Sequence, residues 1–245
     1  MKLVERFMRT LLTLAAVLPG IVVGLGLLAL RRDRRAAVNG AIRTWGRLGT
    51  RAAGIQLDIQ GAPYLESARP CVFFLNHQSG VDPILICELL KGDFVGIAKT
   101  ELRRNPLFGP AFAFVGTVFI DRGDSEQAIR SLEPAIETLS AGTSIAIAPE
   151  GTRGDDGGLG PFKKGGFRLA MEAKVPIVPI VIRNSREVLP GSGWLMQPGR
   201  VSIVVHPPIE TSGWALNRLD AHVAEVRELY RRTLDPRRGA GADSG

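Results

Sequence analysis

Cysteine and histidine are scarce in this chain of 245 residues, which has 2 cysteines and 3 histidines. Two cysteines exclude a disulfide framework, and because Cys71 and Cys87 both sit in apolar runs we expect buried free thiols. The sequence has no HExxH and no paired CxxC that would supply zinc ligands, and its histidines are scattered. No metal site is therefore predicted.

Two common phosphate and hydrolase motifs are also missing. No G-x-x-x-x-G-K-[ST] occurs, which excludes a Walker phosphate loop, and no G-x-S-x-G occurs, which excludes a hydrolase nucleophile elbow. What the chain does have is 45% hydrophobic and 22% charged residues, a composition that excludes wholesale disorder. Its length suits one domain of ordinary size with a substantial core.

The net charge of +7 is confined to the N-terminal segment. Residues 1–60 carry 10 basic and 3 acidic side chains, whereas the rest of the chain carries 21 of each. A nucleic-acid-binding protein more often carries its basic charge on a folded face. A basic segment beside an apolar run suits an anionic lipid surface instead, so we expect membrane lipids and no nucleic acid as partners.

The apolar run extends from Leu11 to Leu30 without a charge, and at ~1.5 Å per residue such a helix could cross ~30 Å of hydrocarbon. The arginine-rich stretch 31–35 follows directly, with no A-x-A site for cleavage of a signal peptide. Pro19-Gly20 fits either a kinked span or a re-entrant pair of half-helices. The arginines after the run outweigh the basic residues before it, so we expect the rest of the chain on the cytoplasmic face of the cell inner membrane.

Three domain-level segments are expected. Residues 1–54 form a membrane anchor and basic helical segment, in which Ile42, Trp45 and Leu48 are spaced by three. This spacing fits an interfacial helix or an ordinary surface helix packed on the domain. Residues 55–234 form the main domain, and residues 235–245 form a flexible tail.

Short apolar runs alternate with helical patterns beyond residue 55. Because the runs are continuous rather than alternating, we expect strands buried on both faces. The predicted strands are Cys71–Leu75, Phe94–Ala98, Val118–Ile120, Ser144–Ala148, Ile177–Ile182 and Val201–Val205. The predicted helices are Asp124–Leu139, with a capping-box-like start, and a second one lined by Leu216, Leu219, Val223, Val226 and Tyr230. This pattern predicts an α/β fold with helices flanking a mainly parallel or mixed sheet.

Reactive side chains follow several of these strands, where function tends to sit in α/β sheets. His77 follows the first strand, and Asp82 lies five residues later. Histidine is a general base near neutral pH, and a carboxylate can orient it. The two residues would not meet on one helix, but they can meet if His77 is in a loop and Asp82 opens the next helix, which Pro83 favours. Alternatively, Asp82 is only an N-cap.

Basic residues follow two further strands. Arg122 comes after Ile120, and Arg153 comes after Ala148 in a segment that ends with Lys163. Arginines at strand ends can cradle a phosphate, and a glycine such as Gly151 allows close backbone approach. Surface salt bridges with nearby aspartates are the alternative.

Taken together, these residues resemble the glycerolipid acyltransferase family, which includes 1-acylglycerol-3-phosphate acyltransferases. Four blocks match in order: Asn76-His77-Gln78-Ser79 with Asp82 as NHxxxxD, Gly116–Arg122, Pro149–Arg153 as the EGTR block, and Val175–Pro179. The resemblance covers roughly residues 60–210. Ala148 stands where the family often has Phe.

The resemblance implies a membrane-bound O-acyltransferase that makes phosphatidate from lysophosphatidate. His77 would take a proton from the acceptor hydroxyl with Asp82 orienting it, and the donor would be acyl-CoA or acyl carrier protein as a co-substrate, with no other cofactor. The acceptor-binding residues carried over are Arg122, Glu150, Gly151, Thr152 and Arg153, with Lys99 and Lys163 as weaker candidates.

Two alternatives stay open at this point. Another acceptor could be used, such as glycerol 3-phosphate, another lysophospholipid or a lyso-aminolipid. A non-catalytic lipid-binding membrane protein would also explain the N-terminal segment, although it would have no need of His77, Asp82 and Arg153.

Overall fold

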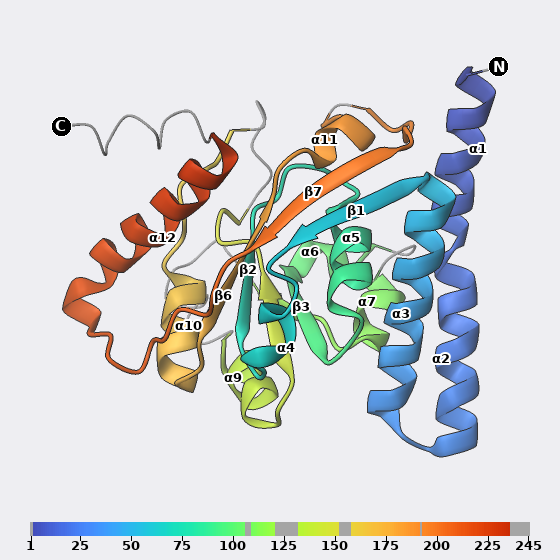
Figure 1. Cartoon of the computed structure of the whole chain (residues 1–245). Helices are drawn as coiled ribbons and strands as arrows, with labels where there is room; N and C mark the ends of the chain where they lie inside the picture. Colours follow the sequence, from blue (N-terminus) through green and yellow to red (C-terminus); the bar gives the residue numbers. More distant parts are fainter. Residues whose placement is uncertain (1, 106–108, 121–131, 152–157, 192, 236–245) are drawn as a thin grey trace. The chain divides into compact units, whose positions relative to one another are not determined.

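The computed structural model describes residues 2–105, 109–120, 132–151, 158–191 and 193–235 (Figure 1). The strands are β1 (Ile55–Gln60), β2 (Val72–Leu75), β3 (Phe94–Lys99), β4 (Val118–Ile120), β5 (Ser144–Ile147), β6 (Ile177–Ile182) and β7 (Gly199–Val205). The longer helices are α1 (Lys2–Ala15), α2 (Val17–Arg31), α3 (Arg34–Ala53), α5 (Asp82–Leu90), α9 (Glu133–Ser140), α10 (Gly165–Ala173) and α12 (Leu219–Leu234). The short ones are α4 (Tyr64–Ser67), α6 (Thr100–Arg103), α7 (Gly109–Phe114), α11 (Ser185–Val188) and the 3-10 turn η1 (Leu216–Arg218).

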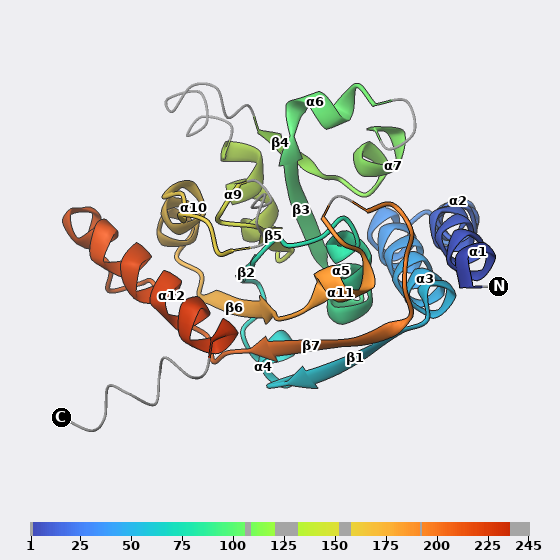
Figure 2. The ribbon, with the colours of Figure 1, turned by 90° about the horizontal axis from the view of Figure 1, so that it is seen from above.

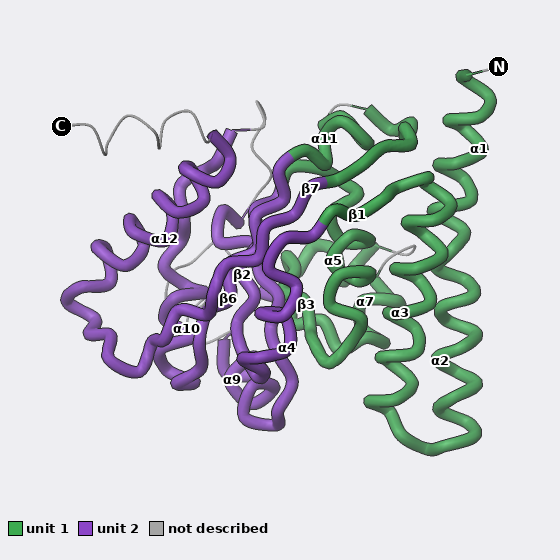
Figure 3. Tube along the Cα trace, in the orientation of Figure 1, with its two compact units in different colours: residues 1–58, 78–119, 184–201 green, residues 59–77, 120–183, 202–245 purple. Residues whose placement is uncertain are grey.

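The sheet has seven strands in the order β1-β7-β6-β2-β5-β3-β4. β2 pairs in parallel with both β5 and β6, whereas β6 pairs with β7 in the antiparallel sense. The expectation of an α/β fold with a mixed, mainly parallel sheet is confirmed. The chain divides into two compact units, of which the first holds residues 1–58, 78–119 and 184–201 and the second holds the remainder (Figure 3).

The first unit contains the N-terminal helices, and α1 leads into α2 with a single interruption at Ala16 (Figure 1). Pro19 explains this interruption, because proline has no N–H to donate to the carbonyl four residues earlier, which belongs to Ala15. α2 then turns into α3 through Arg32, whose φ is 53°, and the Asp33 carboxylate accepts the Ala36 N–H as an N-cap at 3.1 Å. The apolar run therefore lies on two consecutive helices interrupted at one residue.

α2 and α3 lie side by side along their length (Figure 2). A Cβ added to Gly20 would come within 2.9 Å of the Ala41 carbonyl oxygen, so the small residue is what permits this approach. Ile42 is buried while Leu48 is exposed, so the residues spaced by three do not all face the same way. α3 also packs on α5, which matches the second alternative, a helix packed on the rest of its unit.

The stretch Lys2–Arg31 is the one helix among the described residues that is long and apolar enough to cross a membrane, judged by length and composition. Much of its apolar surface faces away from the unit. The exposed large apolar side chains of α1 and α2 are Leu3, Val4, Phe7, Met8, Leu11, Leu12, Leu14, Leu18, Val22, Val23, Leu25 and Leu30. Trp194 lies beside them, edge-on to the Phe7 ring with a centroid separation of 5.8 Å.

The second unit is built around β2, β5 and β6, whose residues are all buried. α10 packs on α9 and β2, and α12 packs on β6. The thiol of Cys71, just before β2, is buried, as is that of Cys87 in the first unit. Burial raises the pKa of both thiols to about 12, as expected for unreactive cysteines.

The predicted strands are confirmed to within two residues, whereas the helices are confirmed in part. Glu133–Ser140 is the described part of the predicted helix 124–139, and its capping-box residues lie outside the described residues. The last helix buries Leu219, Val226 and Tyr230 as predicted. The prediction for Leu216 is wrong, because the chain there forms a 3-10 turn that leaves this side chain exposed.

Candidate functional site

His77 lies two residues beyond the last residue of β2, and its predecessor Asn76 fastens that strand end to β6. The Asn76 side chain donates from Nδ2 to the Ile182 carbonyl oxygen at 2.8 Å and accepts the Ile182 N–H on Oδ1 at 2.7 Å. This buried amide therefore continues the β2–β6 pairing with a side chain after the ladder itself has ended. These two bonds hold the main chain just before His77 against β6.

Glu150 holds the same segment from the strand on the other side. It follows β5, which pairs with β2, and its side chain is only 5% exposed. Oε1 accepts the His77 N–H at 3.0 Å, and Oε2 accepts the Gly160 N–H at 2.8 Å. The carboxylate thus ties His77 to the segment that leads into α10, a role that the residue types alone did not indicate.

These two bonds predict a specific cost for Glu150→Gln. An amide has one acceptor oxygen, so its NH₂ group must face either the His77 N–H or the Gly160 N–H. We expect the variant to lose on the order of 1–3 kcal/mol of stability, as for a buried donor left without an acceptor. Its melting temperature should fall by several degrees.

Thermal unfolding followed by circular dichroism measures this loss. Glu172→Gln, an exposed carboxylate on α10, is the matched control and should leave the melting temperature unchanged. Equal melting temperatures for Glu150→Gln and the wild type would contradict the assigned contacts.

Asp82 belongs to the first unit, where it is the first residue of α5 with Pro83 next to it. Its Oδ2 accepts the N–H groups of Gln78 and Ser79, each at 2.8 Å, and the Ser79 hydroxyl donates to the Leu189 carbonyl at 2.6 Å. The prediction that Asp82 opens a helix is confirmed. The alternative of a simple N-cap is wrong, because the carboxylate binds amides that precede the helix rather than those of its first turn.

Of the remaining predicted residues, Lys99, Lys163 and Gly151 lie in the described part of the chain and three do not. Lys99 ends β3 and is exposed, and Lys163 is exposed beside the Pro149 carbonyl, to which its own N–H donates at 2.8 Å. Gly151, which follows Glu150, has a φ of +77°. This backbone conformation favours glycine over residues with a side chain. Arg122, Thr152 and Arg153 lie outside the described residues.

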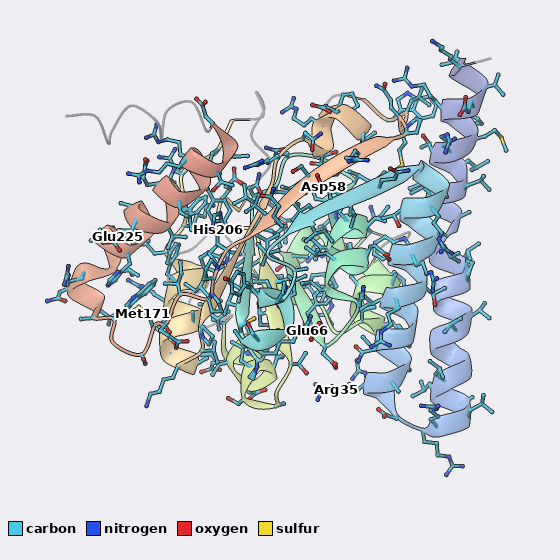
Figure 4. The ribbon with its side chains drawn as sticks, viewed as in Figure 1. Arg35, Asp58, Glu66, Met171, His206 and Glu225 are labelled. Atoms are coloured by element: carbon cyan, nitrogen blue, oxygen red, sulfur yellow. The ribbon has the colours of Figure 1, made fainter. Side chains whose placement is uncertain are left out.

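The other two histidines have structural surroundings. His206, labelled in Figure 4, contacts the Thr233 hydroxyl through Nε2 at 2.9 Å, and burial together with Arg183 lowers its pKa below the ordinary 6.5. His222 stacks on Trp214 at a centroid distance of 4.1 Å. Within the described parts of the chain, no group of three or more His, Cys, Asp or Glu side chains is placed to hold a metal ion.

Known proteins resemble this chain in sequence and in fold. A family model described as Acyltransferase matches residues 56–183, which is more than half of the chain. The chain belongs to the acyltransferase family. The matched range contains β2, His77, Asp82 and Glu150, and it leaves out the N-terminal helices, β7 and α12.

Named relatives of this chain share one description. The 1-acyl-sn-glycerol-3-phosphate acyltransferase of Limnanthes alba is 31% identical over 182 residues, which cover 74% of this chain and 64% of the relative. The 1-acyl-sn-glycerol-3-phosphate acyltransferase alpha of Homo sapiens is 34% identical over 193 residues, covering 77% of this chain and 68% of the relative. The chain thus spans about two thirds of the length of the curated relatives it matches.

A solved structure resembles this chain over nearly its whole length. It is that of the 1-acyl-sn-glycerophosphate (LPA) acyltransferase, PlsC, from Thermotoga maritima, with a TM-score of 0.75 and 25% identity. The match covers 96% of this chain and 98% of that one, so the N-terminal helices and α12 have counterparts there.

Proposed function

We propose that this acyltransferase transfers a fatty acyl group from acyl-CoA or acyl carrier protein to the free hydroxyl of 1-acyl-sn-glycerol 3-phosphate, giving phosphatidate for phospholipid biosynthesis. The observation that carries the proposal is the half-exposed His77, which Asn76 and Glu150 hold directly beyond a central buried strand. The choice of acceptor follows from the names of the relatives. The other proposed catalytic and acceptor-binding residues come from the four sequence blocks.

In the proposed reaction the His77 imidazole takes the proton of the acceptor hydroxyl as this oxygen attacks the thioester carbonyl carbon. A new C–O bond forms, the C–S bond breaks, and the leaving thiolate receives the proton from His77. Asp82 orients His77 and offsets the charge of the imidazolium. The step needs no metal or prosthetic group.

The acceptor phosphate requires positive charge around it. We assign Arg122 and Arg153 to the phosphate, with Lys99 and Lys163 as further cations. Gly151 allows close backbone approach, and Thr152 is a further acceptor-binding residue. Glu150 binds main-chain amides through both oxygens, and we assign it a part in acceptor binding through the neighbours that it positions.

The test is an acyl-transfer assay with labelled acceptors and both donors in parallel. Purified protein in detergent is offered lysophosphatidate, glycerol 3-phosphate and monoacylglycerol, each with acyl-CoA and with acyl carrier protein. We expect phosphatidate from lysophosphatidate and at least 100-fold less product from the phosphate-free acceptor, since Arg–phosphate contacts are strong and bidentate. Equal use of monoacylglycerol would overturn the acceptor assignment, and no product from any pair would overturn the enzymatic one.

We further propose that the exposed apolar surface of α1 and α2 binds the cytoplasmic face of the inner membrane, where a lipid acceptor is found. Trp194 extends this surface, because it is 64% exposed and lies against Phe7. Its loop is fixed to α1 by the Met196 N–H, which donates to the buried Thr10 hydroxyl at 2.8 Å. An indole with an apolar ring and one N–H suits the lipid–water boundary.

Trp194→Ala should weaken binding to anionic phospholipid vesicles by about five- to tenfold, which corresponds to part of the free energy of burying an aromatic ring. Co-sedimentation with vesicles measures the partition. Leu216→Ala is the matched control, because Leu216 is 68% exposed but belongs to the second unit, whereas α1 belongs to the first. An equal loss in both variants, or none in Trp194→Ala, would contradict the role of Trp194.

A further inference from the structure

Helix α12 lies beyond the residues that match the family, yet it reaches the strand that leads to His77. The Tyr230 side chain is completely buried. Its hydroxyl donates to the Phe74 carbonyl oxygen at 2.7 Å and accepts the Ile180 N–H at 3.2 Å. One hydroxyl thereby bridges β2 and β6 next to the place where their ladder ends.

The position of this bridge along β2 matters for His77. Phe74 precedes His77 by three residues, and Ile180 is the register partner of Leu75. After the Tyr230 bridge come the Asn76–Ile182 bonds, and then the bond from the His77 N–H to Glu150. Three consecutive side-chain contacts therefore fix the main chain from Phe74 to His77.

The packing of the Tyr230 ring does not require its hydroxyl group. The ring lies edge-on to Phe162 with centroids 5.1 Å apart, a contact that a phenylalanine would make equally well. Burial raises the pKa of Tyr230 well above its ordinary value, so the hydroxyl keeps the proton that it donates to Phe74. What the hydroxyl adds is a hydrogen-bonded link between two strands.

α12 also binds the segment that donates to the Glu150 carboxylate. Arg227, one turn before Tyr230, donates from Nε to the Gly160 carbonyl at 3.0 Å and from Nη2 to the Leu159 carbonyl at 3.1 Å. The Gly160 N–H is the donor to Glu150 Oε2. The contacts thus form a closed circuit from α12 through β2, His77, Glu150 and Gly160 back to α12.

We propose that Tyr230 is a positioning residue for acyl transfer, whose hydroxyl sets the placement of His77 through β2, and that α12 is therefore part of the catalytic framework. The inference rests on the proposed function only in taking His77 as the base. The contacts themselves all lie within the second unit.

Tyr230→Phe tests the proposal because it removes the hydroxyl and keeps the ring. We expect kcat to fall by about five- to twentyfold with KM within twofold of the wild type, because His77 is displaced while the acceptor-binding groups stay in place. Thr211→Val is the matched control. Its buried hydroxyl also bonds main-chain carbonyls, those of Val175 and Ala170, which do not belong to the circuit.

Two measurements separate positioning from stability. Kinetics are run well below both melting temperatures, and hydrogen exchange followed by mass spectrometry reports on the peptide spanning residues 72–80. We expect faster exchange in this peptide and a lower kcat for Tyr230→Phe alone. A kcat within twofold of the wild type, or an equal loss of kcat in Thr211→Val, would overturn the proposal.

Failure of the proposed function is distinguishable from failure of this inference. If the wild type transferred no acyl group, the acyltransferase assignment of His77 would fall, and the exchange measurement would decide whether Tyr230 positions that segment. Unchanged exchange in Tyr230→Phe would then overturn the positioning role by itself.

Discussion

Replacing His77 by alanine should lower kcat for acyl transfer by about 10²- to 10⁴-fold, the range that a positioned general base contributes. The structure supports a selective loss. The His77 contact to Glu150 is made by the main-chain N–H, and this bond does not depend on the imidazole. The segment after β2 should therefore keep its place in the variant, and KM for the acceptor should change little.

The assay uses purified protein, labelled lysophosphatidate and the better of the two acyl donors. His206→Ala is the matched control, since His206 is also half-buried and lies just beyond the end of a strand. We expect it to keep more than half of the wild-type kcat, and we expect the circular dichroism of both variants to match the wild type. Full activity in His77→Ala with an intact fold would show that His77 is not the base.

Continuous apolar runs were sufficient to predict the strands at the centre of the sheet. Ile177–Ile182 is buried at every position, so neither face supplies a polar residue that would obscure the pattern. β1 was not predicted, because its burial alternates along the strand and it has only three strongly apolar residues. The position of His77 after a strand followed directly from these runs.

The contacts that hold His77 could not be predicted, because they join distant parts of the chain. Asn76 meets a residue 106 positions away, and Tyr230 meets one 156 positions away. Residue type alone makes Glu150 equally suitable for binding a hydroxyl, an arginine or an amide. The placement of its two oxygens against the His77 and Gly160 N–H groups shows that it binds main-chain amides.

Asp82→Asn separates the predicted role of Asp82 in catalysis from its structural role in the loop before α5. Because a single oxygen, Oδ2, accepts both the Gln78 and the Ser79 N–H, the carbonyl oxygen of an asparagine can accept both as well. The loop before α5 should therefore persist, and the melting temperature should change by no more than a few degrees. The negative charge is lost, so an imidazolium that forms on His77 is no longer offset, and we expect kcat to fall by about 10²- to 10³-fold.

Asp82→Ala is the companion variant, because it removes the charge and the acceptor together. It leaves two amides of the loop without their partner in a site where Asp82 and Ser79 are fully buried, and it should lower stability by a further ~1–3 kcal/mol. Thermal unfolding and steady-state kinetics on the two variants give the comparison. A stable Asp82→Asn that keeps wild-type kcat would assign Asp82 to the loop alone. If instead Asp82→Asn is stable and slow while Asp82→Ala is slow and unstable, the one carboxylate both shapes the loop and supplies charge to the reaction.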